Sequence, residues 1–393
     1  MVCHGDDQMT VWLLPDNIAD MLPRQARTME RMRRTCLDLF EVHGFELVKP
    51  PLIEYADSLL TGSGRDVTNN TFRFMDQTNG RVVGIRADMT PQIARIDAHI
   101  LNRRYVTRLC YAGSCLHARP MHPLASREPE VTGCELFGAQ GIEADIEMLS
   151  LAVKTLRKLG VKDIHVDIGH VGVVRSLLDS CDLSDEQLHA ILRALRQKDP
   201  VALAQATSMI GRDVAQSLET LRVSFGGLKE IQALSEQLPR TEEIRSALDD
   251  VQKVARHCGA DHVSFDFCDV HGYQYLTGVS FAVHVPQYTQ AVLRGGRYDG
   301  VGLAFGRSRP ACGFTVYLRA LAGIADFEAP LHEAIVAPGV EDPELDALVQ
   351  KLRDAGRIVV RLLPGESLEH VAEHFVVTHE IVRAKHGFEL VAR

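Results

Sequence analysis

Residues 110–138 read CYAGSCLHARPMHPLASREPEVTGCELFG, two strand-like segments joined by a loop with a proline at each of positions 120, 123 and 129. Prolines interrupt regular structure, so the stretch predicts two strands around a loop. Just before it, TNGRVV at 78–83 contains the Asn-Gly pair typical of a tight hairpin. The strands expected between 71 and 140 are TFRFMD, RVVGIRA, VTRLCYAG and VTGCELFGAQ. This pattern favours a mainly antiparallel sheet.

A second block of strands follows a long helical stretch. It comprises HVSFDF, YLTGVSFAVHV, YTQAVLRGG and RPACGFTVYLRAL, the last of which reads as a buried strand that runs into a helix. Between the blocks, KDIHVDIGH predicts a short strand, and 170–257 predicts an all-helical insertion in which Ser184 caps one helix. Apolar spacing predicts further helices at about 23–43 and 141–160. Helices inserted between two antiparallel blocks indicate an α+β fold.

The C-terminal region has a different pattern. FEAPLH at 327–332 is typical of a linker, and the rest alternates EAIVAPG, a helix near 343–355, RIVVRLLPG and further helix. We therefore expect a domain over 1–327, with the helical insertion at about 170–257, and a small α/β domain over 331–393.

Composition narrows the class of protein. The 393 residues carry a net charge of −9 and nine scattered cysteines with no C-x-x-C pair, which favours reduced thiols in a cytoplasmic protein. No apolar run is long enough to span a membrane, and the acidic balance disfavours nucleic-acid binding.

HVAEH at 370–374 matches an H-x-x-E-H zinc-peptidase pattern, but a solvated helix is the preferred interpretation. We expect no metal and no cofactor.

Two segments carry polar residues suited to a binding site. In GIRADMTPQIARI at 84–96, Asp88 and Thr90 offer a charge and a hydrogen bond to an ammonium group, or Thr90 caps a helix before Pro91. Glu135 lies on a strand expected to be half buried. A carboxylate there needs a partner, which would be either an arginine or a ligand nitrogen.

The stretch LRGGRYDG at 293–300 adds two glycines that allow close backbone approach. Arg297 and Asp299 would pair with each other or with a ligand. The stretch lacks the strand, G-x-G-x-x-G and helix context, which excludes a dinucleotide fingerprint or a P-loop here.

Five segments in order resemble the catalytic core of histidyl-tRNA synthetase, a class II synthetase, over roughly residues 12–325. GFELVKPPLIEY resembles its first motif, which builds the dimer interface, and YAGSCLHARP with GCELFG resembles its second. HGYQYLTGVSF and GGRYDG resemble its two histidine motifs, and PACGFTVYLRAL its third. The resemblance implies a class II antiparallel sheet core and a homodimer through the first-motif region.

The chain departs from that family where the chemistry lies. His117 replaces an essential arginine of the second motif, and Arg119 its adenine-side glutamate. Ala320 replaces the ATP-binding arginine, Tyr317 stands where a missing side chain would admit adenine, and His271 replaces the arginine that bridges carboxylate and phosphate. Loss of one such charge costs about 3 kcal/mol, so loss of three is expected to abolish amino-acid activation. We expect no catalytic residue.

The amino-acid end of the family's pocket is partly kept. By resemblance, Asp88 and Thr90 match the groups that hold the amino group, and Glu135 the carboxylate that faces the imidazole. Val131 and Leu276 replace a glutamine and a tyrosine of the family. The residues of this degenerate histidine pocket would be Asp88, Thr90, His117, Glu135, His271, Tyr275 and Arg297.

WLLPDNIADMLP, RADMTPQIARI and GGRYDG closely resemble the regulatory subunits of ATP phosphoribosyltransferase. That family implies a non-catalytic protein that forms a hetero-octamer with a short catalytic subunit, activates it in the first step of histidine biosynthesis, and conveys feedback inhibition by histidine. Residues 331–393 have 11 acidic and 7 basic residues, a net charge of −4, and so poorly suit an RNA partner. HARPMHPLASREPEV replaces the family's usual glycine-rich, arginine-bearing loop.

Three alternatives stay open. One is an active histidyl-tRNA synthetase with an unusual site, which histidine-dependent ATP–pyrophosphate exchange would reveal. Another is a synthetase paralogue that acts on RNA or in translational control, which salt-sensitive tRNA binding would reveal. The third is a dimer whose former pocket is filled core.

Overall fold

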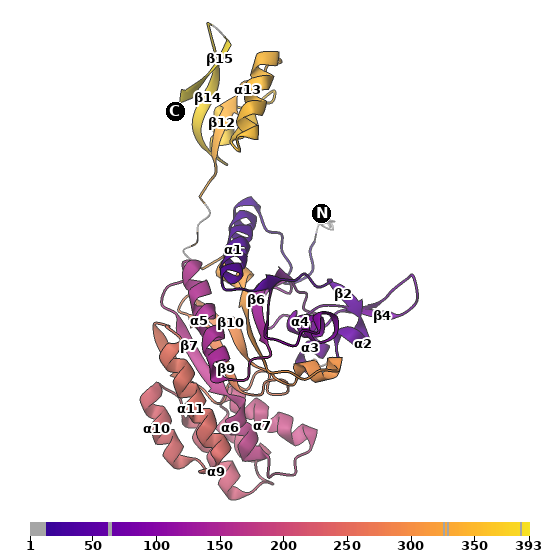
Figure 1. Cartoon of the computed structure of the whole chain (residues 1–393), viewed down its shortest axis with the longest axis vertical. Coiled ribbons are helices and arrows are strands. Elements are labelled where there is room, and N and C mark those ends of the chain that lie inside the picture. The colour runs from indigo at the N-terminus through magenta and orange to yellow at the C-terminus, as the bar shows by residue number, and fades with distance from the viewer. Residues whose placement is uncertain (1–12, 62–64, 325–326, 328–329, 386) are drawn as a thin grey trace, which may run out of the picture. The chain divides into compact units, whose positions relative to one another are not determined.

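The computed structural model describes residues 13–61, 65–324, 327, 330–385 and 387–393. The chain divides into two compact units, Met1–Phe327 and Glu328–Arg393 (Figure 1). Each unit has a sheet and a hydrophobic core of its own.

An eight-stranded sheet organises the first unit. In sheet order its strands are β1 (Glu46–Leu47), β5 (Thr107–Ser114), β6 (Glu130–Phe137), β11 (Ala311–Tyr317), β10 (Tyr288–Arg297), β9 (Val279–Val285), β7 (His165–His170) and β8 (His262–Phe265). Only the outer pairs β1/β5 and β7/β8 are parallel. The predicted antiparallel α+β fold is therefore confirmed.

Three long helices cover one face of this sheet (Figure 1): α1 (Pro23–Val42), α5 (Ile142–Lys158) and α11 (Glu242–His257). Apolar side chains of α1 at helical spacing, including Met32 and Phe40, are completely buried. The ring of Phe40 meets that of Phe314 from β11 edge to face, 5.8 Å between centroids. Burial of one such side chain contributes roughly 2 kcal/mol, which explains why the predicted helices form here.

The opposite face of the sheet is covered by shorter elements. They are α4 (Thr90–Arg95), the π-helical turn η1 (Ile96–Leu101), the 3-10 turn η2 (Val301–Phe305), and a small sheet of β2 (Ile53–Tyr55), β4 (Val82–Ile85) and β3 (Arg73–Met75) with the short helices α2 (Ala56–Leu59) and α3 (Arg65–Asn69). Strands β3 and β4 pair antiparallel, so the hairpin predicted from TNGRVV is confirmed. A second cluster of apolar residues, among them Met89, Ile93 and Tyr111, packs on this face.

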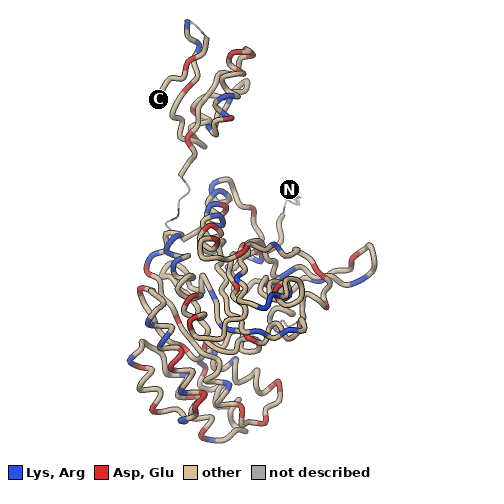
Figure 2. Tube along the Cα trace, in the orientation of Figure 1, with Lys and Arg blue, Asp and Glu red and all other residues tan. Residues whose placement is uncertain are grey.

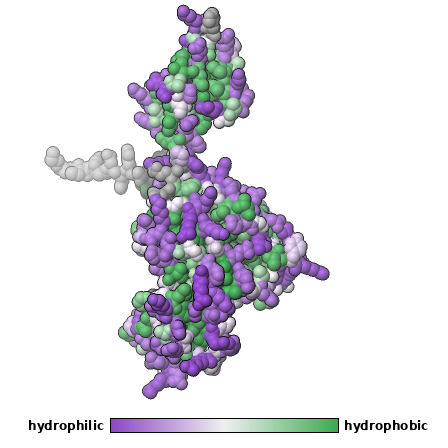
Figure 3. All heavy atoms as spheres, turned by 60° about the vertical axis from the view of Figure 1, so that its left-hand side comes forward, coloured by the Kyte–Doolittle hydropathy of each residue, from purple (hydrophilic) through white to green (hydrophobic). Residues whose placement is uncertain are grey.

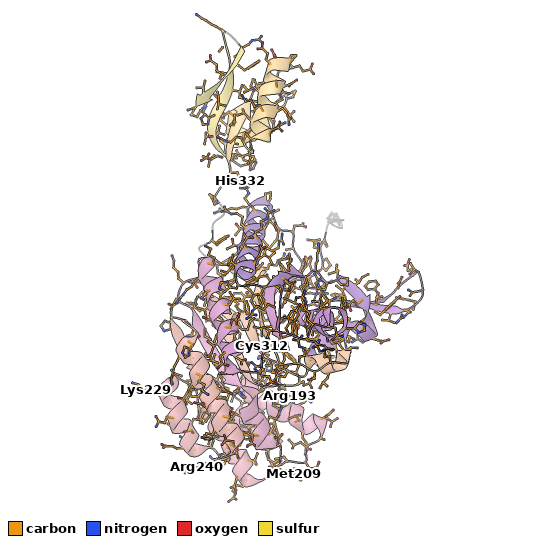
Figure 4. All side chains as sticks on the ribbon, viewed as in Figure 1. Arg193, Met209, Lys229, Arg240, Cys312 and His332 are labelled. Carbon is orange, nitrogen blue, oxygen red and sulfur yellow. The ribbon has the colours of Figure 1, made fainter. Side chains whose placement is uncertain are left out.

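The helical insertion lies at one end of the unit. Its helices before α11 are α6 (Val171–Leu178), α7 (Asp185–Gln197), α8 (Pro200–Ala206), α9 (Arg212–Val223) and α10 (Leu228–Gln237). Ser184 caps α7 as predicted, and Gln187 completes the capping box. In Figure 4, Arg193, Met209, Lys229 and Arg240 lie on this insertion, whereas Cys312 lies in the central sheet. The predicted insertion is confirmed.

Charge and apolar surface are mixed over the molecule. Acidic and basic residues are interspersed along the insertion helices, so neither sign forms a continuous stripe there (Figure 2). Apolar residues also reach the surface of both units (Figure 3). Within the described residues, no helix is both long and apolar enough to cross a membrane.

The second unit has a four-stranded sheet in the order β13 (Ile358–Arg361), β12 (Glu333–Ala337), β14 (Val376–Ala384) and β15 (Gly387–Ala392), with α13 (Pro343–Asp354) and α14 (Leu368–Ala372). The predicted strand, helix and strand are confirmed. The further helix is only the five-residue α14, and two strands that the sequence did not indicate end the chain. In β14 only Ile381 is buried, and apolar and polar residues do not alternate regularly along the strand. The sequence therefore carries no clear strand pattern there.

Candidate functional site

A cavity of about 230 Å³ lies over the middle of the large sheet, on the face opposite α5. Its floor follows the strand register: Glu135 of β6 stands opposite Gly313 of β11, Gly313 opposite Gly296 of β10, and Gly296 opposite Ser280 of β9. Neighbours in such a row point to the same face of a sheet. A Cβ atom on Gly313 would lie 1.7 Å from a carboxylate oxygen of Glu135. Glycine is thus required for Glu135 to lie along the floor.

Glu135 is the most buried carboxyl of the cavity, with 1% of its surface exposed. It accepts hydrogen bonds from the hydroxyls of Thr90 (3.1 Å), Tyr111 (3.0 Å) and Tyr298. Burial, with a smaller contribution from the charge of Asp88, raises the pKa of Glu135 well above its usual value. Glu135 therefore keeps its proton to a higher pH than an exposed glutamate does.

These contacts correct the expectation that Glu135 is half buried, and among the described residues no arginine partners it. Three hydroxyls donate to it, and such uncharged donors offset part of the cost of burial without another ion. Tyr111 and Tyr298 were not singled out from the sequence. Tyr298 is the tyrosine of LRGGRYDG, so its position after two glycines was the available signal.

Asp88 and Thr90 line the cavity from the turn that leads into α4. The backbone N–H of Thr90 donates to Asp88 Oδ1 (3.1 Å), and the helix begins at Thr90 with Pro91 in its first turn. The alternative in which the Thr90 hydroxyl caps this helix is wrong, since that hydroxyl donates to Glu135. Asp88 and Glu135 thus bring two carboxyls to one side of the cavity.

His117 lines both this cavity and a second one that adjoins it, and the residue is only 7% exposed. Its Nε2 lies 3.0 Å from the carbonyl oxygen of Ala87, which requires the proton on Nε2. Burial lowers the pKa of the ring. His117 is therefore a neutral imidazole, and within the described residues its Nδ1 is buried without a hydrogen-bond partner.

His271 contacts an acid that the sequence did not single out. Asp269 accepts from His271 Nδ1 and, at 2.9 Å, from Nη1 of Arg294. Burial alone would raise the pKa of Asp269, but the hydrogen bond from His271 and the charge of Arg294 outweigh it and lower the pKa. Arg294 and Asp269 both line the cavity. Arg294 was visible in the stretch LRGGRYDG, but its orientation depends on the strand phase, which the sequence did not fix.

Arg297 is not among the residues that line the cavity. It is 8% exposed, its Nη2 lies 2.5 Å from Asp145 Oδ2 on α5, and its Nη1 lies 3.2 Å from Asp299. Successive residues of a strand face opposite sides, so Arg294 faces the cavity and Arg297 the helices. Of its two predicted pairings, Arg297 makes the one with Asp299.

The structure therefore brings six of the seven predicted residues together. They are Asp88, Thr90, His117, Glu135, His271 and Tyr275. Leu276 and Val131 also line the cavity.

A second cavity, of about 490 Å³, adjoins the first. The 117–129 loop, β10 and the segment around α12 (Leu318–Leu321) line it, including Tyr317 and Ala320. Arg319 contributes its charge but donates to the carbonyl oxygens of Glu128 (3.1 Å) and Ala19 (2.5 Å). Its guanidinium thus binds the backbone and also lies 3.5 Å from the carboxylate of Glu128.

No group of described residues has the arrangement of a metal site. In the H-x-x-E-H segment, His370 Nδ1 accepts from the backbone N–H of Ser367 (3.2 Å) in the capping box of α14. That imidazole therefore has a structural partner.

Comparisons with known proteins identify the family of the chain. A family model described as histidyl-tRNA synthetase matches residues 17–321, and one described as ATP phosphoribosyltransferase subunit HisZ C-terminal domain matches residues 332–391. The chain is 44% identical over 382 residues to the ATP phosphoribosyltransferase regulatory subunit of Cupriavidus pinatubonensis, covering 97% of this chain and 99% of that protein.

Solved structures show the same fold. An ATP phosphoribosyltransferase regulatory subunit/histidyl-tRNA synthetase from Bacillus halodurans has a TM-score of 0.80 at 25% identity, covering 93% of this chain and 97% of that one. A histidyl-tRNA synthetase from a Nostoc species has a TM-score of 0.75 at 18% identity, covering 94% and 91%. The expected class II synthetase-like fold is confirmed.

Proposed function

Because this chain belongs to the family of ATP phosphoribosyltransferase regulatory subunits, we propose that it binds and activates the short catalytic subunit of that enzyme. The observation that carries the proposal is the match to a regulatory subunit along nearly the whole chain. The chain then supports the first step of L-histidine biosynthesis, in the cytoplasm, without performing the transfer itself.

We propose that histidine, the end product of that pathway, binds in the cavity over the sheet. Asp88 and Thr90 would receive its ammonium group, and Glu135 would face its imidazole. One feature supports this assignment: Asp88 and Glu135 both contact Thr90, the first at its backbone N–H and the second at its hydroxyl, and all three line the same cavity of about 230 Å³. Histidine would convey inhibition by binding more tightly to one state of the complex than to the other.

The region around the first motif supports a homodimer. β1 is an edge strand, and the small sheet and the segment before β5 lie near it in sequence. The apolar side chains exposed in this region are Leu47, Leu52, Ile53, Phe74, Met75, Val82, Ile100 and Tyr105. Such a set is best covered by a second copy of the chain. Two dimers of this kind with four catalytic subunits would make the expected hetero-octamer.

The test is to mix the purified chain with a short catalytic subunit and measure phosphoribosyl-ATP formation with and without histidine. We expect the two proteins to co-elute, the rate to rise on mixing, and histidine to lower it. The catalytic subunit alone is the control for stimulation.

A variant, Asp88→Asn, separates the two roles. It should still co-elute and stimulate the catalytic subunit but respond to histidine only at higher concentrations. Absence of both co-elution and stimulation by the unmodified chain would refute the proposed function.

A further inference from the structure

The cavity has an unbalanced set of charges. Five carboxyls line it, those of Asp88, Glu135, Asp167, Asp266 and Asp269. Among the residues that line it, Arg294 is the only lysine or arginine. An amino acid brings an ammonium group, which the acids suit, and a carboxylate, which they repel. The cavity therefore needs a cation at the carboxylate end, and His271 now occupies the position of the arginine that synthetases use there.

From this we infer that Arg294 forms the carboxylate subsite: it binds the α-carboxylate of an amino acid whose ammonium group lies at Asp88 and whose side chain lies at Glu135. The inference rests on the proposed binding of histidine in this cavity. It assigns to Arg294 the role that the family's lost arginine would have had.

The strand register puts Arg294 at a suitable separation from Glu135. Arg294 stands opposite Thr315 of β11, and Gly296, two residues along β10, belongs to the same row as Glu135. Two strand spacings and one two-residue step separate the Cα atoms of Glu135 and Arg294 by about 12 Å. Both side chains project from the floor on the same face, so an amino acid lying across Gly296 and Gly313 spans the distance between them.

The guanidinium of Arg294 has N–H groups that donate to no described residue. Of its five N–H groups, one donates to Asp269 (2.9 Å), and no other described residue accepts from it. With 29% of the side chain exposed, the remaining donors can reach a ligand. A carboxylate that accepts two parallel N–H bonds matches the guanidinium fork.

Asp269 positions this cation. It is held by His271 as well as by Arg294, so it anchors one edge of the guanidinium and leaves the other edge free. The histidine at 271 thus acts indirectly: it fixes the acid that orients the arginine.

The test compares two ligands by titration calorimetry: L-histidine, and histamine, which keeps the imidazole and ammonium groups but lacks the carboxylate. We expect the unmodified chain to prefer histidine. Arg294→Gln should weaken histidine binding about 10- to 100-fold, the range for a lost hydrogen bond to a charged group, and should change histamine binding less than about threefold. The matched control is Arg319→Gln, which removes a cation from the adjoining cavity and should leave both affinities unchanged.

If Arg294→Gln weakened the binding of histidine and of histamine equally, or the binding of neither, the assignment of the carboxylate subsite would be overturned. If the unmodified chain binds histidine without preferring it to histamine, the subsite fails while the histidine cavity stands. If it binds neither, the histidine cavity itself fails. Should Arg294→Gln not fold, Arg294→Lys keeps the charge without the fork, and an unchanged preference in that variant would also refute the assignment.

Discussion

The two adjoining cavities share a border but differ in what their side chains can bind. His117, His271, Arg294 and Tyr317 line both. Five carboxyls line the first cavity and none lines the second, where Arg319 is bound to backbone carbonyl groups. The first holds the groups proposed to recognise an amino acid, whereas the second is lined by no carboxyl and, among lysines and arginines, only by Arg319 and the shared Arg294. We therefore expect recognition of the amino acid to be separated from its activation in this chain.

The largest effect expected from this difference is on activation. The purified chain should show no histidine-dependent ATP–pyrophosphate exchange above background. We expect its exchange rate to be at least about 10⁴-fold below that of a histidyl-tRNA synthetase assayed in parallel, because three charges that stabilise the transition state are expected to be missing. By the resemblance to synthetase motifs, His117, His271 and Ala320 stand where that family carries arginines. Exchange above the background of a heat-inactivated sample would contradict the separation of the two cavities.

The next effect concerns Arg297, which belongs to neither cavity. Arg297→Ala leaves Asp145 buried without its partner, and we expect a loss of about 3–5 kcal/mol in the free energy of unfolding. Urea denaturation measures it. In the control, Arg245→Ala, an exposed ion pair with Glu242 is removed, and no measurable change is expected. If Arg297→Ala kept the free energy of unfolding of the unmodified protein but bound histidine more weakly, Arg297 would instead belong to the site.

A smaller effect is expected at the acidic end of the first cavity. Glu135→Gln keeps the shape and the neighbouring hydroxyls but cannot become a carboxylate, so histidine should bind roughly 10- to 100-fold more weakly. Calorimetry measures this affinity. The control is Glu128→Gln, on the loop beside the second cavity, and equal affinity in all three proteins would show that Glu135 does not face the ligand.

The smallest effect is on the pH dependence of stability. The pKa of Glu135 is raised by folding, while in the unfolded chain it is near 4.3. The stability that protonated Glu135 contributes is thus complete below about pH 4.3 and is lost as the pH rises through the raised value. The melting temperature of the unmodified protein should fall relative to that of Glu135→Gln across this range. A constant difference would contradict the raised pKa.

The fold and most of the site followed from the sequence because their signals are local or ordered along the chain. Met32 and Phe40 lie at helical spacing, Ser184 precedes two acids, and the strand blocks frame a helical insertion. Asp88, Thr90 and Glu135 were identified by their residue type and by resemblance to synthetase motifs. Their meeting in one cavity agrees with that resemblance.

The rest depended on register and burial, which the sequence does not display. Arg294 and Arg297 differ by three positions, so a strand turns them to opposite faces, and choosing between them requires the pairing of β10 with β11. Tyr111 approaches Glu135 only because Gly133 and Gly313 leave room. In the second unit, the mainly unburied residues of β14 gave no alternating pattern.

The hydroxyl-bound Glu135 has a consequence for the energetics of ligand binding. Burial raises the pKa of Glu135, so this carboxyl keeps its proton to a higher pH than an exposed glutamate does, beside the place proposed for an imidazole. A neutral imidazole that enters can accept this proton, and the resulting imidazolium and carboxylate then attract each other without drawing a proton from solvent. At a pH where Glu135 still holds its proton and the free imidazole is neutral, the heat of histidine binding should accordingly be the same in phosphate and in Tris, two buffers with very different heats of ionisation.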